Sequence, residues 1–251
     1  MPRVDFRTPR LYLDAPLNAG AILTLDRDKA HYLANVLRLR EGASVLIFNG
    51  RDGEWRATIS GGKRPDRLTL IEQTRPQEAA IDLHYAFAPL KHARLDYMVQ
   101  KAVEMGVAAL VPVMTQHTQP TRVNVERMAA NAIEAAEQCG ILAIPAVHEP
   151  VALESWLQAR DAARLLIFCD EDAEIASPLE ALNAHAAHGS PLAVLIGPEG
   201  GFSVQERTLL LRQPNILRLS LGPRILRADT AAVAALALVQ AALGDWGHAS
   251  A

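Results

Sequence analysis

Hydrophobic and polar residues alternate in short runs over the first 73 positions of the chain. A period of two is typical of strands that bury one face, and glycine-containing pairs between the runs, such as Asn49-Gly50 and Gly61-Gly62, are typical of tight turns. The pattern predicts a small β-barrel. Its predicted strands cover residues 10–13, 21–25, 44–48, 54–60 and 68–73.

One helix is predicted inside this β-rich part. Asp26 is a residue type that caps helix N-termini, and Leu33, Val36 and Leu37 follow it at helical spacing. We expect these three side chains to share one buried face.

The rhythm changes at Ile81, from where strand-like apolar runs alternate with helical segments, as in α/β folds with a mainly parallel sheet. The polar stretch 73–78 contains Pro76 and has no apolar period, which predicts a linker. We therefore expect one domain over residues 1–73 and a second over 79–246. Predicted strands of the second domain cover residues 109–114, 144–148, 165–169, 192–196 and 216–221.

Helix boundaries in the second domain carry local signals. Apolar residues from Leu95 to Met105 recur at helical spacing, and Gly106 is placed to end that helix in the left-handed conformation. Ser203 and Glu206 have the spacing of a capping box, which predicts a helix start.

Two glycine-rich loops follow apolar strands in this domain. The strand at 192–196 leads into the first loop, residues 197–203, and the strand at 216–221 leads into the second loop, residues 222–227. Glycine lets a backbone turn sharply and approach a ligand closely. Neighbouring parallel strands deliver such loops to one sheet edge, where open α/β folds bind ligands. Together the loops predict a ligand site, whereas either loop alone fits a tight turn without a ligand equally well.

Several ligand classes are disfavoured by what the loops lack. A dinucleotide fingerprint would follow the first strand of the domain, but residues 86–91 contain no glycine. Neither loop has the lysine of a Walker motif, and the Gly-x-Ser-x-Gly elbow of hydrolases is absent.

The formal net charge of −3 is unevenly distributed. Residues 1–75 contain 13 Lys and Arg against 9 Asp and Glu, and the rest of the chain contains 12 against 19. A basic N-terminal part suits a polyanion such as RNA, although an excess of this size is also ordinary variation.

No apolar run suits a signal peptide or a membrane span, so we expect a cytoplasmic protein. Cys139 and Cys169 lack Cys-x-x-Cys spacing, and Cys139 is interpreted as a small buried residue. His185 and His188 lie three positions apart, but no third ligand has suitable spacing. We expect no metal site.

Seven motifs follow one another along the chain: His31-Tyr32-Leu33, Val36 to Gly42, Lys91 with Leu95, Gln100 to Val107, Ala132 to Gly140, Gly197 to Ser203 and Leu221 to Arg227. Taken in this order, they resemble the RsmE family of bacterial small-subunit (16S) ribosomal RNA uridine-N3 methyltransferases, in the SPOUT class of knotted methyltransferases. The resemblance spans essentially the whole chain.

The resemblance implies an N-terminal PUA-like RNA-binding barrel and a C-terminal SPOUT α/β domain with a deep trefoil knot. It also implies S-adenosyl-L-methionine as the cofactor, held by both loops, with Leu221, Ile225 and Leu226 as walls for the adenine. The implied cofactor-binding residues are Leu195, Gly197, Pro198, Glu199, Gly200, Gly201, Leu219, Ser220, Leu221, Gly222, Ile225, Leu226, Arg227 and Ala228.

The chain departs from the family pattern at three places. Ala228-Asp229 stands where Thr-Glu is usual, residues 116–122 form a compact loop where a longer one with serine and arginine is common, and Ile141 stands where arginine is usual.

Methylation at uracil N3 requires that the N3 proton leaves and that nucleophile and methyl group are aligned. Glu199 is the candidate base, with hydrogen bonding to amides of its own loop as the alternative. Arg227 is the candidate for neutralising the uracil carbonyl oxygens. Asp229 either adds charge at the entrance of the last helix or serves as its N-cap.

The implied partners are 16S ribosomal RNA or the assembled small subunit, and a second copy of the chain. The apolar helix 230–243 suits either a core or the homodimer interface. The candidates for RNA contact, each of which taken singly also fits a solvated surface residue, are Arg3, Arg7, Arg10, Arg38, Arg40, Lys91 and Arg94.

Two other function classes stay open. A knotted methyltransferase acting on transfer RNA or on a ribose hydroxyl would keep both loops. An RNA-binding module without catalysis would have disrupted loops, and both are intact here.

Overall fold

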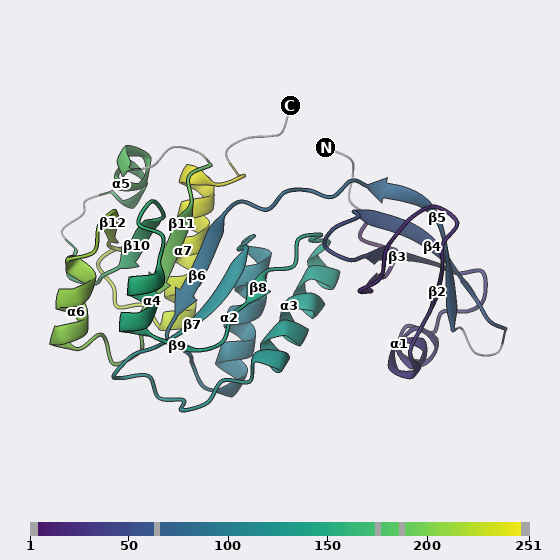
Figure 1. Cartoon of the computed structure of the whole chain (residues 1–251), viewed down its shortest axis with the longest axis horizontal. Coiled ribbons are helices and arrows are strands. Elements are labelled where there is room, and N and C mark those ends of the chain that lie inside the picture. Colours follow the sequence, from purple (N-terminus) through teal and green to yellow (C-terminus); the bar gives the residue numbers. More distant parts are fainter. Residues whose placement is uncertain (1–4, 63–65, 174–176, 186–188, 247–251) are drawn as a thin grey trace. The chain divides into compact units, whose positions relative to one another are not determined.

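The computed structural model describes residues 5–62, 66–173, 177–185 and 189–246 (Figure 1). The chain divides into two compact units, each with its own sheet. Unit 1 comprises residues 1–79 and 136–144, and unit 2 comprises residues 80–135 and 145–251.

Unit 1 is built on a five-stranded mixed sheet in the order β1-β3-β4-β5-β2. Strand β1 is parallel to β3, and the other neighbours are antiparallel. Strands β1 and β2 are its two edges, so the described residues form a half-barrel where a barrel was predicted. The five predicted strands are confirmed as β1 (Arg10–Tyr12), β2 (Ile22–Thr24), β3 (Ser44–Phe48), β4 (Glu54–Ser60) and β5 (Arg67–Arg75).

The helix predicted in this unit begins as expected, because Asp26 caps α1 (Arg27–His31). It then widens into a π-helical turn, η1 (Tyr32–Val36), in which hydrogen bonds span five residues instead of four. The wider turn changes which side chains share a face. Leu33 is buried, but Val36 is 59% exposed, so the shared buried face was wrong for Val36.

Unit 2 contains a seven-stranded parallel sheet in the order β12-β10-β11-β6-β7-β8, with β9 paired to β7. Strands β7, β10 and β11 have the predicted bounds, whereas β8 has two residues and β12 ends before the predicted Leu221. The strands are β6 (Leu83–Phe87), β7 (Ala109–Met114), β8 (Ala146–Val147), β9 (Val151–Ala152), β10 (Leu165–Cys169), β11 (Leu192–Ile196) and β12 (Ile216–Leu219).

Strand β10 pairs with β11 on one side and with β12 on the other. The strands that carry the two glycine-rich loops therefore flank β10. From the sequence these two strands were expected to be neighbours, and that expectation was wrong. Because all three run parallel, their carboxyl ends still lie together, at what we call the carboxyl edge of the sheet.

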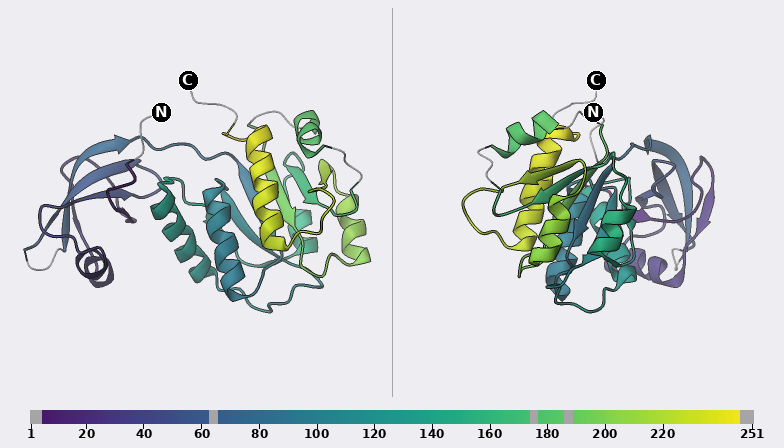
Figure 2. Two further views of the ribbon diagram at one scale, coloured as in Figure 1. Left: turned by 180° about the vertical axis from the view of Figure 1, so that it is seen from behind. Right: turned by 60° about the vertical axis from the view of Figure 1, so that its left-hand side comes forward.

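Helices cover both faces of this sheet. Helices α2 and α7 pack on each other and lie in front in the left view of Figure 2, whereas α4 and α6 pack on each other at the opposite face. In the described segments, every helix is too short or too polar to cross a bilayer. The helices are α2 (His92–Glu104), α3 (Val125–Cys139), α4 (Leu153–Ala159), α5 (Pro178–His185), α6 (Val204–Leu211) and α7 (Ala228–Leu243).

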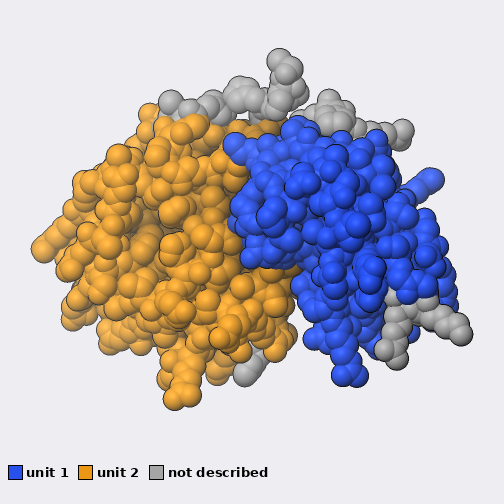
Figure 3. All heavy atoms as spheres, turned by 45° about the vertical axis from the view of Figure 1, so that its right-hand side comes forward, with its two compact units in different colours: residues 1–79, 136–144 blue, residues 80–135, 145–251 orange. Residues whose placement is uncertain are grey.

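Unit 1 includes a segment from the middle of the chain, residues 136–144, which nothing in the sequence pattern predicted (Figure 3). This segment holds the last turn of α3 and the residues after it. The Glu137 carboxylate accepts the backbone N–H of Tyr12 at 2.8 Å, and the carbonyl of Gly140 accepts a hydrogen bond from Arg75 Nη1 at 2.8 Å.

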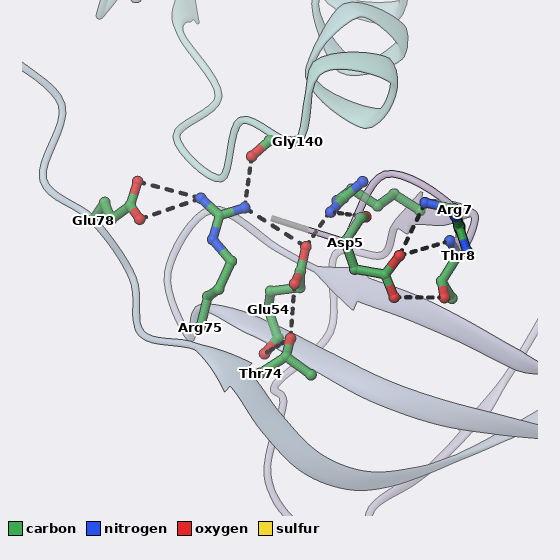
Figure 4. A network of polar contacts seen from close by, with 9 residues as sticks. Asp5, Arg7, Thr8, Glu54, Thr74, Arg75, Glu78 and Gly140 are labelled. Carbon is green, nitrogen blue, oxygen red and sulfur yellow. Dashed lines mark hydrogen bonds and ion pairs between the residues drawn. The ribbon is translucent and has the colours of Figure 1, made fainter. Parts of the chain in front are cut away.

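A buried carboxylate organises unit 1 (Figure 4). The Glu54 side chain is 1% exposed, and its Oε2 lies 2.8 Å from Arg10 Nε and 3.8 Å from Arg75 Nη1. Thr74 donates its hydroxyl to Oε1 at 2.7 Å. Gln73, Thr74 and Arg75 thus continue β5 beside β4, and the prediction of a linker from residue 73 was wrong for these three residues.

A second buried carboxylate lies at the end of β10 in unit 2. The Asp170 side chain is 1% exposed and accepts Arg207 Nη1 at 2.5 Å and Arg218 Nε at 2.7 Å. Burial alone would raise the pKa of Asp170, but the hydrogen bonds from both arginines outweigh burial and hold this pKa below its ordinary 3.8. Asp170 thereby connects β10 to α6 and β12 at the carboxyl edge.

We predict that Glu54→Gln destabilises the protein by about 3–5 kcal/mol, because Arg10 would be left buried without a counter-charge and Arg75 would keep only its pair with the exposed Glu78 carboxylate. Urea unfolding measures this difference. Glu72→Gln is the matched control, since Glu72 is 62% exposed in its ion pair with Arg56, and should cost less than about 1 kcal/mol. Equal losses in the two variants would contradict the organising role of Glu54.

We predict that Asp170→Asn lowers stability at neutral pH by on the order of 2–3 kcal/mol. Because the folded-state pKa is the lower one, the stabilisation is complete above the unfolded-state pKa near 3.8 and is lost as pH falls below it. The variant should therefore lose less stability than the wild type on acidification through this range, measured by urea unfolding across pH. Asp172→Asn, at a carboxylate 72% exposed beside the same Arg207, should behave like the wild type.

Candidate active site

The first loop turns sharply between β11 and α6. A Cβ on Gly197 would lie 2.5 Å from the Phe202 ring, so only glycine fits there, and Gly201 has a φ of +71°. The predicted capping box is confirmed: Ser203 accepts the N–H of Glu206, whose carboxylate accepts the N–H of Ser203.

The loop after β7 supports the first loop from the side. His117 donates from Nδ1 to the carbonyl of Gly201 at 2.9 Å, and the N–H of Gln116 bonds to Glu206 Oε1 at 2.7 Å. A Cβ on Gly200 would lie 3.4 Å from the His117 Cβ. Neither support was predicted, because only the compactness of residues 116–122 marked this loop in the sequence.

The second loop follows β12 and ends at α7. Arg227, not Asp229, occupies the N-cap position of α7, so the interpretation of Asp229 as the N-cap is wrong. Asp229 lies in the first turn instead. Gly222 has a φ of +102°, in the left-handed region that favours glycine.

Both loops present an open backbone and apolar side chains. A Cβ on Gly201 or Gly222 would meet no atom within 4 Å, so the backbone at these positions is open to close approach. Ile225 is 90% exposed, and Leu226 is only partly buried. This combination fits a ligand with a flat apolar part and polar edges, as adenine has.

Arg94, in the first turn of α2, joins the two loops. Its Nη1 forms an ion pair with Glu199 Oε1 in the first loop, and its Nε lies 3.0 Å from Asp229 Oδ2 just after the second loop. The hydrogen bond from Arg94 lowers the pKa of Asp229. Glu199, the candidate base, and Arg94, a candidate RNA contact, are thus partners of each other.

A pocket of about 790 Å³ opens at the carboxyl ends of β6 and β7. It extends from Leu90 and Lys91 to the start of α3. Lys91 and Arg122 contribute exposed cationic side chains to its lining.

The other predicted RNA contacts differ in their exposure in the structure. The prediction for Arg10 is wrong, because its side chain is 3% exposed and paired with Glu54. Arg3 lies outside the described residues. The exposed candidates are Arg7, Arg38, Arg40 and Lys91.

Two further expectations concern cysteine and histidine. Cys139 is exposed and not buried, because it is the last residue of α3. Of the predicted histidine pair, His188 lies outside the described residues, while His185 Nδ1 lies 2.8 Å from the carbonyl of Ala181. Among the described residues, no group of three or more His, Cys, Asp or Glu is arranged to hold a metal.

The loops that form this site lie in a stretch matched by a known domain family. Residues 77–240 match the family model of the RNA methyltransferase domain, and residues 25–72 match that of the RNA methyltransferase PUA domain. The ribosomal RNA small subunit methyltransferase E of Rickettsia conorii is 31% identical over 92% of this chain and 94% of its own length. That of Bacillus subtilis is 28% identical over 84% of this chain and 87% of its own.

Solved structures agree in fold. The methyltransferase Lpg2936 of Legionella pneumophila, in complex with the cofactor SAM, has a TM-score of 0.83 and 30% identity, covering 94% of this chain and 98% of that one. A ribosomal RNA small subunit methyltransferase E from Neisseria gonorrhoeae, bound to S-adenosyl methionine, has a TM-score of 0.82 at 24% identity, covering 96% and 100%. The chain therefore belongs to the RNA methyltransferase family of the ribosomal RNA small subunit methyltransferase E proteins.

Proposed function

We propose that the protein transfers a methyl group from S-adenosyl-L-methionine to N3 of a uridine in the 16S ribosomal RNA of the small subunit. The observation that carries this proposal is the placement of two open glycine-rich loops at one sheet edge, in a chain whose relatives are named small subunit methyltransferases. The cytoplasm is the compartment that such a substrate implies.

The proposed cofactor site uses the backbone of both loops. Leu221 and Leu226 provide apolar walls, while Gly201 and Gly222 allow close approach of polar edges. When bound, the cofactor supplies an activated methyl group, which N3 takes as the sulfonium becomes a neutral thioether. The side chains of Leu195 and Leu219 are fully buried in their strands, so these residues contribute through their backbone.

Arg227 is the proposed catalytic residue. It is exposed at the N-cap of α7, where the partial positive charge of the helix terminus adds to its own. When the N3 proton leaves to water, negative charge spreads over N3 and the two uracil carbonyl oxygens, and a guanidinium stabilises that anion. Because Arg94 engages Glu199, we assign Glu199 the role of holding its loop and not that of the base.

The substrate uridine enters, in this proposal, through the pocket at the ends of β6 and β7. It has room for a nucleoside, and it lies at the same edge as both loops. In this proposal Lys91, which is exposed and lines the pocket, contacts an RNA phosphate.

We also propose that the protein acts as a homodimer. The family resemblance implies a second copy, and a copy seated at the second loop would cover Ile225, which is 90% exposed, and would complete the site. The deep trefoil knot remains part of the same proposal.

We predict that Arg227→Ala lowers methylation by about 100-fold or more while cofactor binding is retained. Labelled S-adenosylmethionine is incubated with small subunits from cells lacking the endogenous activity, with naked ribosomal RNA and transfer RNA in parallel, and the product is identified by mass spectrometry. Arg224→Ala, at an exposed arginine of the same loop, is the control and should stay within about threefold of the wild type.

N3-methyluridine in small-subunit RNA supports the proposal. Methylated transfer RNA or a methylated ribose would instead favour the other knotted enzymes. Cofactor binding without methylation of any of these RNAs would sink the substrate claim.

We predict that Lys91→Ala weakens RNA binding and reduces the salt dependence of log K by about 0.7–0.9, the loss of one phosphate contact. Filter binding over a range of salt concentrations measures this slope. Arg212→Ala, at an exposed arginine ending α6 at the opposite edge of the sheet, should leave the slope unchanged. An unchanged slope in Lys91→Ala would remove Lys91 from the RNA site.

A further inference from the structure

Arg94 is the described side chain that touches both sides of the candidate cofactor site. Its side chain is 33% exposed and contacts the side chains of Glu199, 37% exposed, and Asp229, 18% exposed. The three residues lie on three segments: the start of α2, the first loop and the first turn of α7. One cation thus connects segments that are 105 and 135 positions away along the chain.

The sheet does not connect the two loops directly. Strand β10 lies between β11, which leads to the first loop, and β12, which leads to the second. The separation of the loops beyond the strand ends must therefore be fixed by side chains. Arg94 is suited to this role because a guanidinium has donors in a rigid planar fork, which can hold two carboxylates at a set distance and angle.

Removing this cation would do more than delete two hydrogen bonds. Glu199 and Asp229 both contact the same guanidinium, so without it two carboxylates would lie near each other with no counter-charge. Like charges at that separation repel, and the loops that carry them would move apart.

The remaining nitrogen of Arg94 indicates that the contact does not serve stability alone. Its Nη2 is buried and has no hydrogen-bond partner within the described structure. A buried donor without a partner costs free energy, which offsets part of what the two ion pairs contribute.

We propose that Arg94 is a positioning residue that fixes the two loops at the separation S-adenosyl-L-methionine requires, and that it is not an RNA contact. The inference rests on the proposed function, in which these loops hold the cofactor. Asp229 has a defined role in this scheme. It lies in the first turn of α7 and accepts a hydrogen bond from Arg94, which ties the start of α7 to the first loop.

The test is calorimetric titration of S-adenosylmethionine into the full-length wild type, Arg94→Ala, Arg94→Lys and Asp229→Asn. We expect Arg94→Ala to raise the cofactor Kd by about tenfold or more. Arg94→Lys keeps the charge without the fork, and its Kd should remain well above that of the wild type. In steady-state assays KM for the cofactor should rise, whereas KM for RNA should not.

The matched control is Arg164→Ala. Arg164 makes a two-pronged ion pair with Asp82 at 2.7 and 2.9 Å, but before β10 and β6, at the opposite edge of the same sheet. It should leave the cofactor Kd unchanged within about twofold. In the double variant Arg94→Ala/Asp229→Asn, the cofactor Kd should rise by less than the product of the two single-variant increases. It should lie close to the Kd of Arg94→Ala alone, because the two residues act through one contact.

Wild-type cofactor affinity in Arg94→Ala would overturn the proposal, as would a variant that loses RNA affinity alone. If Arg94→Ala does not fold, the cofactor Kd and the two KM values of Arg94→Lys and Asp229→Asn test the proposal instead. A wild type that does not bind the cofactor would instead defeat the proposed function itself, so the two failures are distinguishable.

Discussion

Parallel pairing of β10 with strands on both of its sides is the constraint on which the candidate site depends. A parallel strand must be reached by a crossover from the far edge, so each of β10, β11 and β12 releases its loop at the same edge. Strand β11 is buried along its whole length, which leaves it no alternative position at a sheet margin. If β12 were antiparallel to β10, the second loop would lie at the opposite edge of the sheet from the first loop. The two loops could then form no shared site.

Ion pairs then fix the positions of segments that the strands only bring close together. Glu54 in unit 1 and Asp170 in unit 2 are each buried anions that receive two arginines. Arg94 reverses the arrangement, with one cation between two carboxylates. In each case segments distant in sequence converge on one charged group. For the buried carboxylates Glu54 and Asp170, loss of hydration is tolerable only while their partners stay in place. Such ion-paired centres hold their segments in a narrow range of positions. A site that must align a nucleophile with a methyl group needs that precision.

Local signals in the sequence predicted most of the elements. The apolar runs of β10 and β11 and the capping box at Ser203 depend on neighbours a few residues away, and their positions were correct. The π-helical turn was missed because its apolar spacing looks α-helical, which put Val36 on the wrong face.

The candidate site was predicted only in part. Both loops were found, because glycine and proline mark them. Partnerships across the chain leave no such mark: an arginine has the same sequence signature as a surface cation whether it pairs, as Arg10 and Arg94 do, or stays exposed, as Arg227 does. Burial and pairing of charged residues are decided by the assembled fold, so those roles had to wait for the structure.

The path of α3 has a consequence for how this protein can be taken apart. The helix starts in unit 2 and its last turn belongs to unit 1, where Gly140 and Glu137 supply acceptors to Arg75 and Tyr12. No single cut of the polypeptide therefore yields two intact halves. A fragment ending at residue 79 would leave Arg75 without its carbonyl partner, and the complementary fragment would keep a stretch of helix with nothing of its own to fold against. A fragment of unit 1 that keeps all of its contacts must therefore include residues 136–144 as well as residues 1–79.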